Sequence, residues 1–489
     1  MAKYIWIRIF KSIVSIIVVV SIVIVMLFTM IPREKIFEND EGYRKLKGDQ
    51  KTTYVYNKYD QLGYLDYLTL SDMCNERSEN VASCMVVGSN ESNEVLAYYK
   101  SKGYVIETLR SGTPYAYHDF NPLELLGHFY ANLIVIDNPN AVQDENNPNL
   151  ERKYYFGADT NGVPAIMCSG CKYKYQLYFD TSFPFIHQHA ISLNFGQSYP
   201  TKSGTPTLDV INEGQGSQVK IEQTFETGLV QESPIIQHSC QYKVRTDHLD
   251  ETRFTDHYAD CKSYYSSPSM VTTSYIFGVI SLVIAYVIAI PFGIFMAQKK
   301  DKAVDKIGIA IINFLIAVPS LALIFFVRQI GSNLGFPDKF PQLGFTNIKS
   351  YVIPIVVLVL LNIPGLMTWI RRYMLDQSSA DYVKFAKAKG LSQNEIFIKH
   401  ILKNAIIPIV NGIPSSIILC ISGALITETA FAIPGMGKML PDAISKVNNN
   451  MVITLTFIFS ALSIFAVLLG DILMTWVDPR IQLAAKKGE

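Results

Sequence analysis

The sequence has 489 residues, of which 49% are hydrophobic and 17% are charged, and its formal net charge at neutral pH is +1. Nucleic-acid binding requires clustered Lys and Arg that neutralise phosphates, so this nearly neutral chain without a basic domain is not expected to bind nucleic acid. The averages combine two different regions, because several long uncharged runs flank one long polar segment.

Each uncharged run has about 20 residues, the length of a helix that crosses about 30 Å of hydrocarbon. A single run could be a buried core helix or, for the first one, a cleavable signal peptide, but the number of runs predicts a multi-pass membrane protein. The first run ends at Ile31-Pro32 and lacks the small residues of a signal-peptide cleavage site, so we predict that it is a retained membrane anchor. The six runs are 12–32, 270–298, 307–327, 350–370, 404–427 and 451–470.

Lys and Arg beside these runs predict their orientation, because positively charged loops stay on the cytoplasmic side. Every second loop carries them, which places both termini in the cytoplasm. We therefore predict an N-terminal transmembrane helix at 1–32, an extracellular domain at 33–268 and a five-helix core at 269–489. The basic residues are Lys3, Arg8 and Lys11, then Lys299, Lys300, Lys302 and Lys306, then Arg371, Arg372, Lys384, Lys387 and Lys389, and finally Lys486 and Lys487.

The segment 33–268 is long enough for a domain with its own hydrophobic core. Two stretches show the alternation of polar and apolar residues that is typical of half-buried strands. The apolar side of the first is Tyr173, Tyr175, Leu177 and Phe179. The second has Val219, Ile221 and Phe225, followed by a turn at Gly228. We expect a mixed α/β domain with a substantial sheet.

Six of the seven cysteines lie in this predicted domain, and only Cys420 lies in a membrane run. An even number of cysteines in an extracytoplasmic domain predicts disulfides, although six cysteines allow fifteen pairings among which the sequence does not choose. Our preference is for two pairs that close short loops, Cys74 with Cys84 and Cys240 with Cys261. The candidates are Cys74, Cys84, Cys168, Cys171, Cys240 and Cys261.

Two short motifs in the same domain could indicate other chemistry. Cys168-Ser-Gly-Cys171 has the spacing of a redox or zinc motif, but no second pair or thioredoxin-like pattern accompanies it. His187-Gln-His189 would share one face of a strand, but without a third ligand we expect surface histidines. No nucleophile can be paired with a base. We therefore predict no catalytic residue and no metal site, and we do not expect an enzyme.

The cytoplasmic loop at 371–404 has the pattern of two short helices. Ser379 can cap a first helix that runs through Asp381, and Gly390 can end it in the left-handed conformation that glycine tolerates. Ser392 and Glu395 then have the spacing of a capping box at the start of a second helix.

Small side chains in the first of these helices, Ala386 and Ala388, flank Lys387. They would permit close approach by the surface of another protein. The same residues also fit a solvated basic loop whose only role is to set the membrane topology.

The stretch "TETAFAIPGMGKM" at 427–439 contains glycines that suggest a phosphate-binding loop. A true P-loop needs glycine five residues before the Gly-Lys pair and Ser or Thr after the Lys, and here those places hold Ala432 and Met439. The predicted topology also puts this stretch on the outer face, where ATP is not available. We expect this chain to bind no cofactor.

Few polar side chains lie inside the membrane runs. Asn313 and Asn362 are the clearest, and polar residues inside a membrane are functional candidates by default. Arg328 and Asp471 lie toward the ends of their runs, where snorkelling to the interface is the commoner explanation. A weakly charged path suits cargo of varied sequence, because fixed charges at low dielectric would impose strong preferences.

The cytoplasmic pattern resembles the coupling loop of ABC importer permeases. Asp381-Tyr-Val-Lys-Phe-Ala-Lys-Ala-Lys-Gly390-Leu-Ser, followed by His400 and Lys403-Asn-Ala-Ile-Ile-Pro408, is similar to the peptide-importer branch, the OppB-type permeases. The "TETAFAIPGMGKMLPDAI" stretch, "LNFGQSYPTKSGTPTLDVI" at 193–211 and "DPRI" at 478–481 resemble further elements of that family. The stretches 33–189 and 212–264 would be insertions, as in the long AmiC-like forms of Gram-positive bacteria.

The resemblance implies a membrane α-helical protein with six transmembrane helices, the type I ABC importer permease fold, and an inserted extracellular mixed α/β domain. It implies a place in the cell membrane of a Gram-positive bacterium, surrounded by membrane lipid. The implied partners are a homologous second permease, two ABC ATPases that bind ATP and magnesium, an extracellular peptide-binding lipoprotein and the peptide substrate. The residues implied to meet an ATPase are Asp381, Phe385, Ala386, Lys387, Ala388, Gly390 and Leu391. Those implied for the translocation path and its outer turn are Asn313, Asn362, Glu428, Pro434, Gly435 and Gly437.

Two other functions fit parts of the pattern. A membrane receptor with an extracellular sensing domain would also have an N-terminal anchor, a folded outer segment and a second span. The further spans and the coupling loop argue against a receptor. A permease for another solute, such as nickel or a glycan, is the second alternative.

Overall fold

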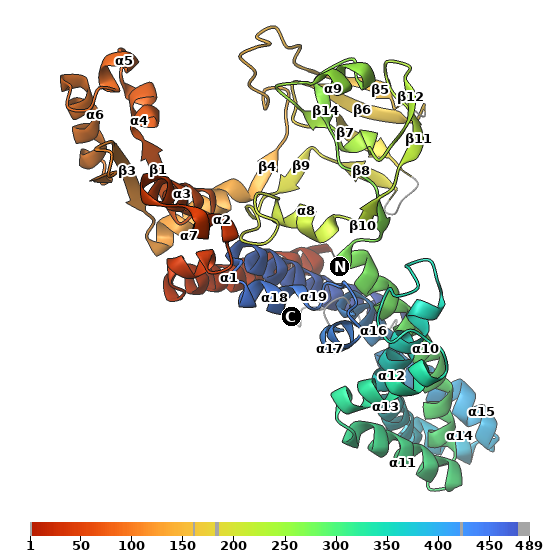
Figure 1. Cartoon of the computed structure of the whole chain (residues 1–489). Helices are drawn as coiled ribbons and strands as arrows, with labels where there is room; N and C mark the ends of the chain where they lie inside the picture. The colour runs from red at the N-terminus through yellow and green to blue at the C-terminus, as the bar shows by residue number, and fades with distance from the viewer. Residues whose placement is uncertain (1, 160–161, 181–184, 421–423, 478–489) are drawn as a thin grey trace. The chain divides into compact units, whose positions relative to one another are not determined.

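The computed structural model describes residues 2–159, 162–180, 185–420 and 424–477. They form two compact units, which we describe separately (Figure 1). The helical unit comprises Met1–Val23, Ser269–Ser445 and Val452–Glu489, and the mixed unit comprises Ile24–Pro268 and Lys446–Met451. The stretch 478–481 that resembles a family element, and the basic residues Lys486 and Lys487, lie outside the described residues.

The helical unit contains helices of the length that crosses a membrane. Five stretches are long and apolar enough to do so: Trp6–Met30, Met270–Gln298, Lys349–Ser378, Gln393–Leu419 and Asn449–Leu473. They correspond to five of the six predicted runs. The elements of this unit are α1 (Ala2–Met30), α10 (Met270–Gln298), α11 (Ala303–Ala317), α12 (Ser320–Asn333), α13 (Lys349–Ser378), α14 (Asp381–Ala388), α15 (Gln393–Ile396), the π-helical turn η3 (Phe397–Leu402), α16 (Lys403–Leu419), α17 (Leu425–Ala430), α18 (Met439–Ser445) and α19 (Asn449–Val477).

The remaining predicted run, 307–327, is not a single helix. The helices α11 and α12 meet across a short break at an angle of 102°. Pro319 has no backbone N–H and disfavours helical geometry in the residue before it, and Val318 accordingly has an extended ψ of 126°. The run is therefore a bent pair of helices, because a count of apolar residues ignores the proline, and the pair counted as one span gives the predicted six.

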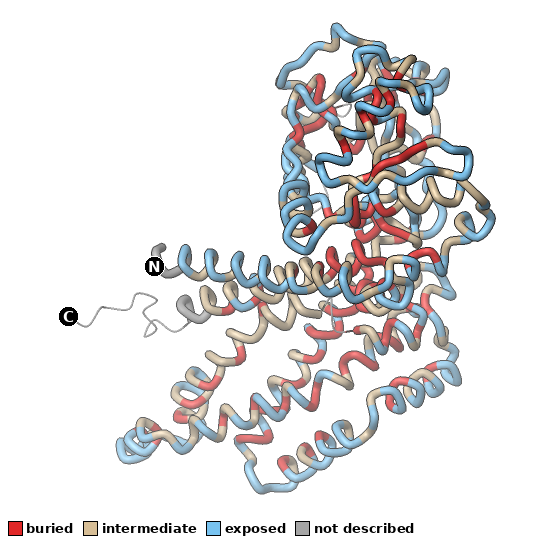
Figure 2. The backbone as a smooth tube through the Cα atoms, turned by 90° about the vertical axis from the view of Figure 1, so that its left-hand side faces the viewer, coloured by how far each residue is buried: buried red, intermediate tan, exposed pale blue. Residues whose placement is uncertain are grey.

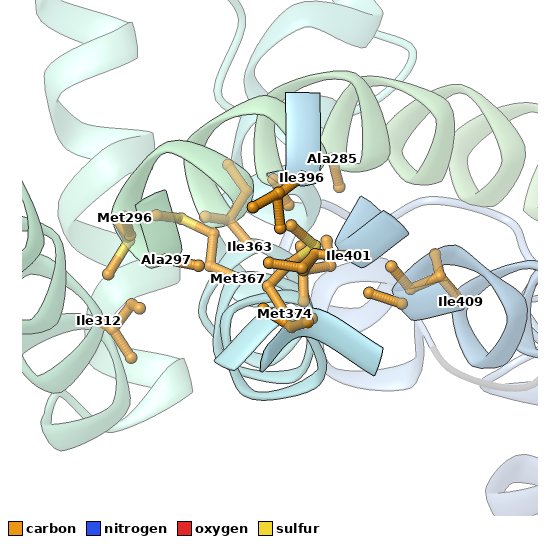
Figure 3. Packing of buried hydrophobic residues seen from close by; sticks show 14 of the residues in the cluster. Ala285, Met296, Ala297, Ile312, Ile363, Met367, Met374, Ile396, Ile401 and Ile409 are labelled. Atoms are coloured by element: carbon orange, nitrogen blue, oxygen red, sulfur yellow. The ribbon is translucent and has the colours of Figure 1, made fainter. Parts of the chain in front are cut away.

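The helix α13 is the central helix of its unit. Half of its most apolar stretch is buried by the rest of the chain, whereas only 11% of the corresponding stretch of α1 is buried (Figure 2). Side chains from α10, α11, α13, α14, α15, η3 and α16 form one core cluster, of which Figure 3 shows 14 residues. Its labelled members are Ala285, Met296, Ala297, Ile312, Ile363, Met367, Met374, Ile396, Ile401 and Ile409. In contrast, α1 leaves most of its apolar surface to its surroundings.

Two charged residues near the ends of membrane runs have partners within the chain. The Arg328 guanidinium donates to the Ala430 carbonyl oxygen at 3.0 Å and pairs with the Asp338 carboxylate at 2.9 Å. Asp471 of α19 forms an ion pair with Arg8 of α1. Both residues therefore have an opposite charge beside them, which stabilises a charge in a poorly hydrated site, and the snorkelling of Arg328 and Asp471 to the interface stays a prediction.

The mixed unit combines short helices with short antiparallel strands. Its first half contains η1 (Arg33–Phe37), α2 (Glu41–Lys45), α3 (Gly48–Gln61), β1 (Leu65–Thr69), α4 (Leu70–Arg77), α5 (Val81–Cys84), α6 (Asn90–Ser101), β2 (Val105–Thr108), β3 (Pro114–Asp119), α7 (Pro122–Leu133) and β4 (Ile134–Ile136). Its second half contains β5 (Lys153–Ala158), β6 (Pro164–Ser169), β7 (Tyr175–Phe179), β8 (Ile186–Gln188), β9 (Ile191–Leu193), α8 (Thr207–Asn212), β10 (Gln215–Gln218), β11 (Ile221–Thr224), β12 (Val230–Ser233), η2 (Gln237–Ser239), β13 (Gln241–Tyr242), α9 (His248–Arg253), β14 (Tyr258–Asp260) and β15 (Tyr265–Ser267).

The predicted mixture of helix and strand in this unit is confirmed, but the sheets are small. Among the described residues the largest has four strands in the order β5-β6-β7-β8, and another has three in the order β1-β3-β2. The predicted turn at Gly228 joins β11 to β12, with φ of +84° at the glycine. An aromatic cluster that includes Phe37, Tyr59 and Tyr64 forms the core near β1.

One predicted strand is present, but its burial follows the prediction only at Tyr175 and reverses after Gln176. In β7, Tyr175 and Tyr178 are buried while Leu177 and Phe179 are exposed. The pairing with β6 shifts register at this point, so that Gln176 has no opposite residue and the alternation is displaced by one. Gln176 is itself buried, and its amide donates to the Asp137 carboxylate at 2.8 Å.

Three disulfides hold the mixed unit: Cys74–Cys84, Cys168–Cys171 and Cys240–Cys261. The two preferred short-loop pairs are confirmed. His187 and His189, which we expected at the surface, are both partly buried, and the His189 ring stacks on Tyr173 with a centroid distance of 4.2 Å. Burial lowers the pKa of this histidine. Among the described residues, no group of three or more His, Cys, Asp or Glu is placed to hold a metal ion.

Replacing Cys240 and Cys261 together by serine should destabilise the mixed unit by about 3 kcal/mol, because the bond closes a loop of 21 residues and limits the unfolded chain. The change should appear as faster proteolysis of the purified chain near Phe225 and Tyr258, which share a core cluster with Cys240. Cys420→Ser, the matched control at a free cysteine, should leave the digestion unchanged. Equal digestion of the double variant and the control would contradict the prediction.

Candidate functional site

The predicted coupling segment contains two helices joined at a glycine. The helix α14 ends at Ala388, and Gly390 follows with φ of +79°. Its N–H donates to the Lys387 carbonyl at 2.9 Å, and the N–H of Leu391 donates to the Ala386 carbonyl at 3.3 Å. This pair of bonds is the Schellman motif, which requires the left-handed conformation at the glycine. A Cβ at Gly390 would meet no atom within 4 Å, so the backbone conformation alone selects glycine.

The second helix does not end near the coupling segment. The Ser392 side chain accepts a hydrogen bond from the N–H of Glu395 at 3.3 Å, as the capping pattern predicts. From there the chain stays helical through α15, η3 and α16, over the 27 residues of Gln393–Leu419. Whatever displaces α15 therefore also displaces a membrane helix.

The start of the first helix differs from the prediction. Ala380, and not Ser379, occupies the N-cap position of α14, without a side-chain cap. The Ser379 hydroxyl donates instead to the Asp376 carbonyl at 2.9 Å, at the end of α13. Ser379, which we predicted to cap α14, is therefore the C-cap of α13.

The predicted coupling residues divide between two faces of α14. Val383 and Ala386 are buried in the core cluster. The same cluster contains Ile396 and Ile401 of the following helix, which Figure 3 labels. Ala386 therefore allows close packing within this chain and is not part of an exposed contact face. The exposed residues are Asp381, Phe385, Lys387, Ala388 and Gly390, while Leu391 is partly buried.

Phe385 stands out on the exposed face, because 69% of this large apolar residue is accessible. Lys384 and Lys387 lie beside it, also exposed. An apolar ring surrounded by cationic side chains on a short helix is a suitable contact for a groove on another protein.

An ion pair joins two helices that lead into this region. The Arg371 guanidinium of α13 contacts the Asp305 carboxylate of α11 through two hydrogen bonds of 2.7 and 2.8 Å. Asp305 is fully buried. Such bidentate pairs fix orientation as well as distance, so α11 is held to the cytoplasm-facing end predicted for α13.

A second candidate element is the turn at 428–438, which closes over a buried carboxylate. Glu428 in α17 is 1% exposed. Its carboxylate accepts a hydrogen bond from the Ser274 hydroxyl of α10 at 2.7 Å and another from the N–H of Lys438 at 3.2 Å. The Ser274 hydroxyl in turn accepts from the N–H of Met436 at 2.7 Å.

This network explains the glycines of the turn. A Cβ at Gly435 would overlap the Glu428 carboxylate, and one at Gly437 would lie 2.9 Å from its Oε2 atom. The backbone can therefore approach the carboxylate only because both positions lack a side chain. The glycines and Pro434 form a tight turn around a side chain of the same chain and leave no cradle for phosphate.

The two predicted path asparagines lie on exposed parts of α11 and α13. Asn313 lines a groove of about 370 Å³ together with Thr368, Arg371, Arg372 and Asp376. Asn362 lies on α13 outside that groove, and its amide donates to the Leu358 carbonyl at 2.7 Å. The structure thus brings only Asn313 together with charged side chains.

Comparison with known proteins identifies the helical segment. Residues 289–483 match the family described as "Binding-protein-dependent transport system inner membrane component". The matched region includes the coupling segment, the turn at 428–438 and the groove between α11 and α13. The Streptococcus pneumoniae protein named oligopeptide transport system permease protein AmiC is 43% identical over 500 residues, covering all of both chains.

The chain belongs to this family of ABC transporter permeases. A further relative is the oligopeptide transport system permease protein AppB of Bacillus subtilis, 31% identical over 215 residues that cover 42% of this chain and 67% of AppB. The dipeptide transport system permease protein DppB of the same organism is 28% identical, covering 44% of this chain and 68% of DppB. The mixed unit lies almost wholly outside the segment matched by the family, yet AmiC aligns across it.

The family membership confirms the predicted OppB-type permease of AmiC-like form, with the type I importer permease fold in the helical unit. Permeases of this kind are multi-pass membrane components and are not enzymes. Sequence reasoning missed Ser274, which holds the turn at 428–438, because a serine near the start of an apolar run carries no distinctive signal. It also missed Asn448-Asn-Asn450, although three consecutive amides at the entry of a membrane run were visible as an unusual feature.

Gly390→Val should separate ATP hydrolysis from solute transport in this permease, because a β-branched residue costs about 1–2 kcal/mol in the left-handed conformation. The measurement is the ratio of solute transported to ATP hydrolysed in the reconstituted transporter. Gly390→Asn is the matched control, because asparagine tolerates positive φ, and it should keep the wild-type ratio. A wild-type ratio in the valine variant would contradict the role of the glycine.

Gly435→Ala should destabilise the helical unit by about 1–3 kcal/mol, because the new methyl group would overlap the Glu428 carboxylate. Gly412→Ala is the control: this position is in α16 and has no atom within 4 Å of an added Cβ. Alanine there should be neutral or stabilising by up to about 1 kcal/mol. Thermal unfolding in detergent compares the two variants, and equal melting temperatures would contradict the proposed close approach.

Proposed function

We propose that this chain is a transmembrane subunit of an ATP-driven oligopeptide importer. The observation that carries the proposal is the 43% identity to AmiC across the whole length of both chains, mixed unit included. A homologous second permease would complete the translocation path. Two cytoplasmic ABC ATPases would bind ATP and magnesium, and an extracellular lipoprotein would deliver the peptide.

The translocation path is proposed to run along the uncovered side of α13. Asn362, Gly365, Thr368 and Arg372 are all exposed and follow one another at helical spacing. A Cβ at Gly365 would meet no atom within 4 Å. Polar residues in a membrane helix rarely face lipid, and they usually line a water-filled cavity or the interior of a bundle. A path of amides and hydroxyls suits peptides, whose backbones offer hydrogen bonds regardless of sequence.

Coupling is proposed to occur at the exposed face of α14. Phe385 would occupy a groove of an ATPase subunit, with Asp381, Lys387 and Ala388 around it. Movement of the ATPases would shift α14 and, through the shared core cluster, the continuous helix Gln393–Leu419. Rigid-body shifts of membrane helices alternate access in transporters of this general kind.

The proposed topology has both termini in the cytoplasm and the mixed unit on the outer face of a Gram-positive cell. The positive-inside pattern of the loops supports this orientation. The disulfides of the mixed unit support it as well, because such bonds persist in oxidising, extracytoplasmic surroundings. The mixed unit would then be placed to receive the peptide-binding lipoprotein.

The function is tested by reconstituting the chain with its sister permease, the two ATPases and the binding lipoprotein in vesicles. We expect ATP-dependent uptake of a labelled hexapeptide that stops when the binding protein is omitted. Nickel ions and a muropeptide fragment serve as alternative cargoes in the same vesicles. Uptake of either one in preference to the hexapeptide, or peptide uptake without the ATPases, would overturn the proposal.

A further inference from the structure

The first turn of α19 is held inside the mixed unit by three consecutive asparagines. Asn448, Asn449 and Asn450 are 1%, 7% and 7% exposed. The segment Lys446–Met451 belongs to the mixed unit, although the helix α19 that begins within it continues far into the helical unit. We call Asn448–Asn450 the asparagine clasp.

The side chain of Asn448 uses all of its hydrogen-bonding capacity. Its Nδ2 atom donates to the Ser198 hydroxyl at 2.8 Å and to the Thr201 hydroxyl at 3.1 Å. Its Oδ1 atom accepts from the N–H of Tyr199 at 3.4 Å and from the N–H of Met451 at 3.3 Å. An asparagine amide offers two donors and one oxygen with two lone pairs. One residue thus caps α19 and binds the loop at 198–201.

The other two asparagines bind neighbouring parts of the same unit. Asn449 donates to the Tyr64 hydroxyl at 2.7 Å, and Asn450 donates to the Gln197 carbonyl at 3.0 Å. Gly196 has φ of +83°, and a Cβ there would lie 2.6 Å from the Asn450 amide nitrogen. The loop approaches the clasp this closely because position 196 has no side chain.

The partners of the clasp are themselves fixed. Tyr64 is 2% exposed, and burial raises its pKa to about 12, so the hydroxyl stays protonated. Its ring packs on Phe28, near the end of α1, with a centroid distance of 4.4 Å. Burial opposes ionisation of Asp40, but hydrogen bonds from the Tyr199 and Tyr54 hydroxyls hold the pKa of this carboxyl below its usual value. The ends of two membrane helices, α1 and α19, are thus built into one polar and aromatic network.

Separating the first turn of α19 from this network would leave several buried amide groups without partners. Each unsatisfied buried group pays its desolvation penalty without the compensating hydrogen bond, so the separation is unfavourable. The 29 residues of α19 form one helix, whose first turn carries the clasp.

We propose that Asn448, Asn449 and Asn450 are positioning residues that keep the first turn of α19 bound to the loop at 198–201 and to Tyr64 during transport. A binding protein that docks on the mixed unit acts through the clasp on α19, and the nucleotide-driven movement of α19 changes the presentation of the mixed unit outside. This inference rests on the proposed function, because it assumes that the helices move and that a peptide-binding protein docks on this chain.

The first test breaks the clasp with the double substitution Asn448→Ala and Asn450→Ala. Basal ATP hydrolysis of the reconstituted transporter should remain, while its stimulation by binding protein loaded with a hexapeptide should fall about tenfold, within the range typical of coupling between sites. Asn140→Ala, at an exposed asparagine of the same unit, is the control and should keep full stimulation. Full stimulation in the double variant would overturn the proposal.

The second test replaces the hydrogen bonds by a covalent bridge. Ser198→Cys and Asn448→Cys are introduced together with Cys420→Ser, because the Ser198 and Asn448 side-chain atoms lie 2.8 Å apart. Before oxidation this variant should have the weak stimulation of a broken clasp, and after oxidation it should recover wild-type stimulation and uptake. A bridged protein that no longer transports would show that the mixed unit must part from α19, which would also overturn the proposal.

The two tests separate this inference from the proposed function. If wild-type protein in the same vesicles takes up no hexapeptide, the proposed function is wrong. If wild-type protein transports and the bridged variant does not, only the clasp is wrong. Recovery on oxidation shows that the weak stimulation before oxidation comes from the broken clasp and not from misfolding, because a misfolded protein would not recover.

Discussion

The helical unit depends on one constraint: a polar group in a poorly hydrated place must have a partner inside the protein. Asp305 forms an ion pair with Arg371, and Asp471 forms one with Arg8. The Glu428 carboxylate accepts hydrogen bonds from the Ser274 hydroxyl and from the N–H of Lys438. Each partner lies on a different helix or segment, so the need to satisfy one charge fixes the relation between two elements. These few contacts orient a bundle whose apolar side chains alone would permit many similar packings.

Backbone geometry supplies the second constraint. Pro319 lies at the break between the helices α11 and α12. Gly390 ends α14 in the left-handed conformation, which other residues adopt at a cost in free energy. Between such breaks the helices are long and continuous. The helix that begins beside α14 is continuous from Gln393 to Leu419. This continuity supports the proposed mechanical link between an ATPase and the membrane path.

The mixed unit is stabilised differently from the helical unit. Within the described residues its sheets have two to four strands, too few to bury a large core, and disulfides and an aromatic cluster add to its stability. The first turn of α19 is bound to this unit by amides, whose geometry is more specific than apolar contact. The Asn448 side chain uses all of its hydrogen-bonding capacity, so replacing it would leave buried groups unpaired.

The sequence by itself determined the membrane class, the apolar helices, the two short helices joined at Gly390, the cysteine pairs of short spacing and the family, because these follow from local patterns of apolar length, glycine placement and motif. Only the tertiary structure decided the bend at Pro319, the inward direction of Ala386, the change of burial within β7 and the partners of Arg328 and Glu428. The physical reason is that hydrogen-bond partners and strand register are set between residues far apart in the chain. Ser274 and Glu428 are separated by 154 positions and Asn448 and Ser198 by 250, so no local pattern could pair them.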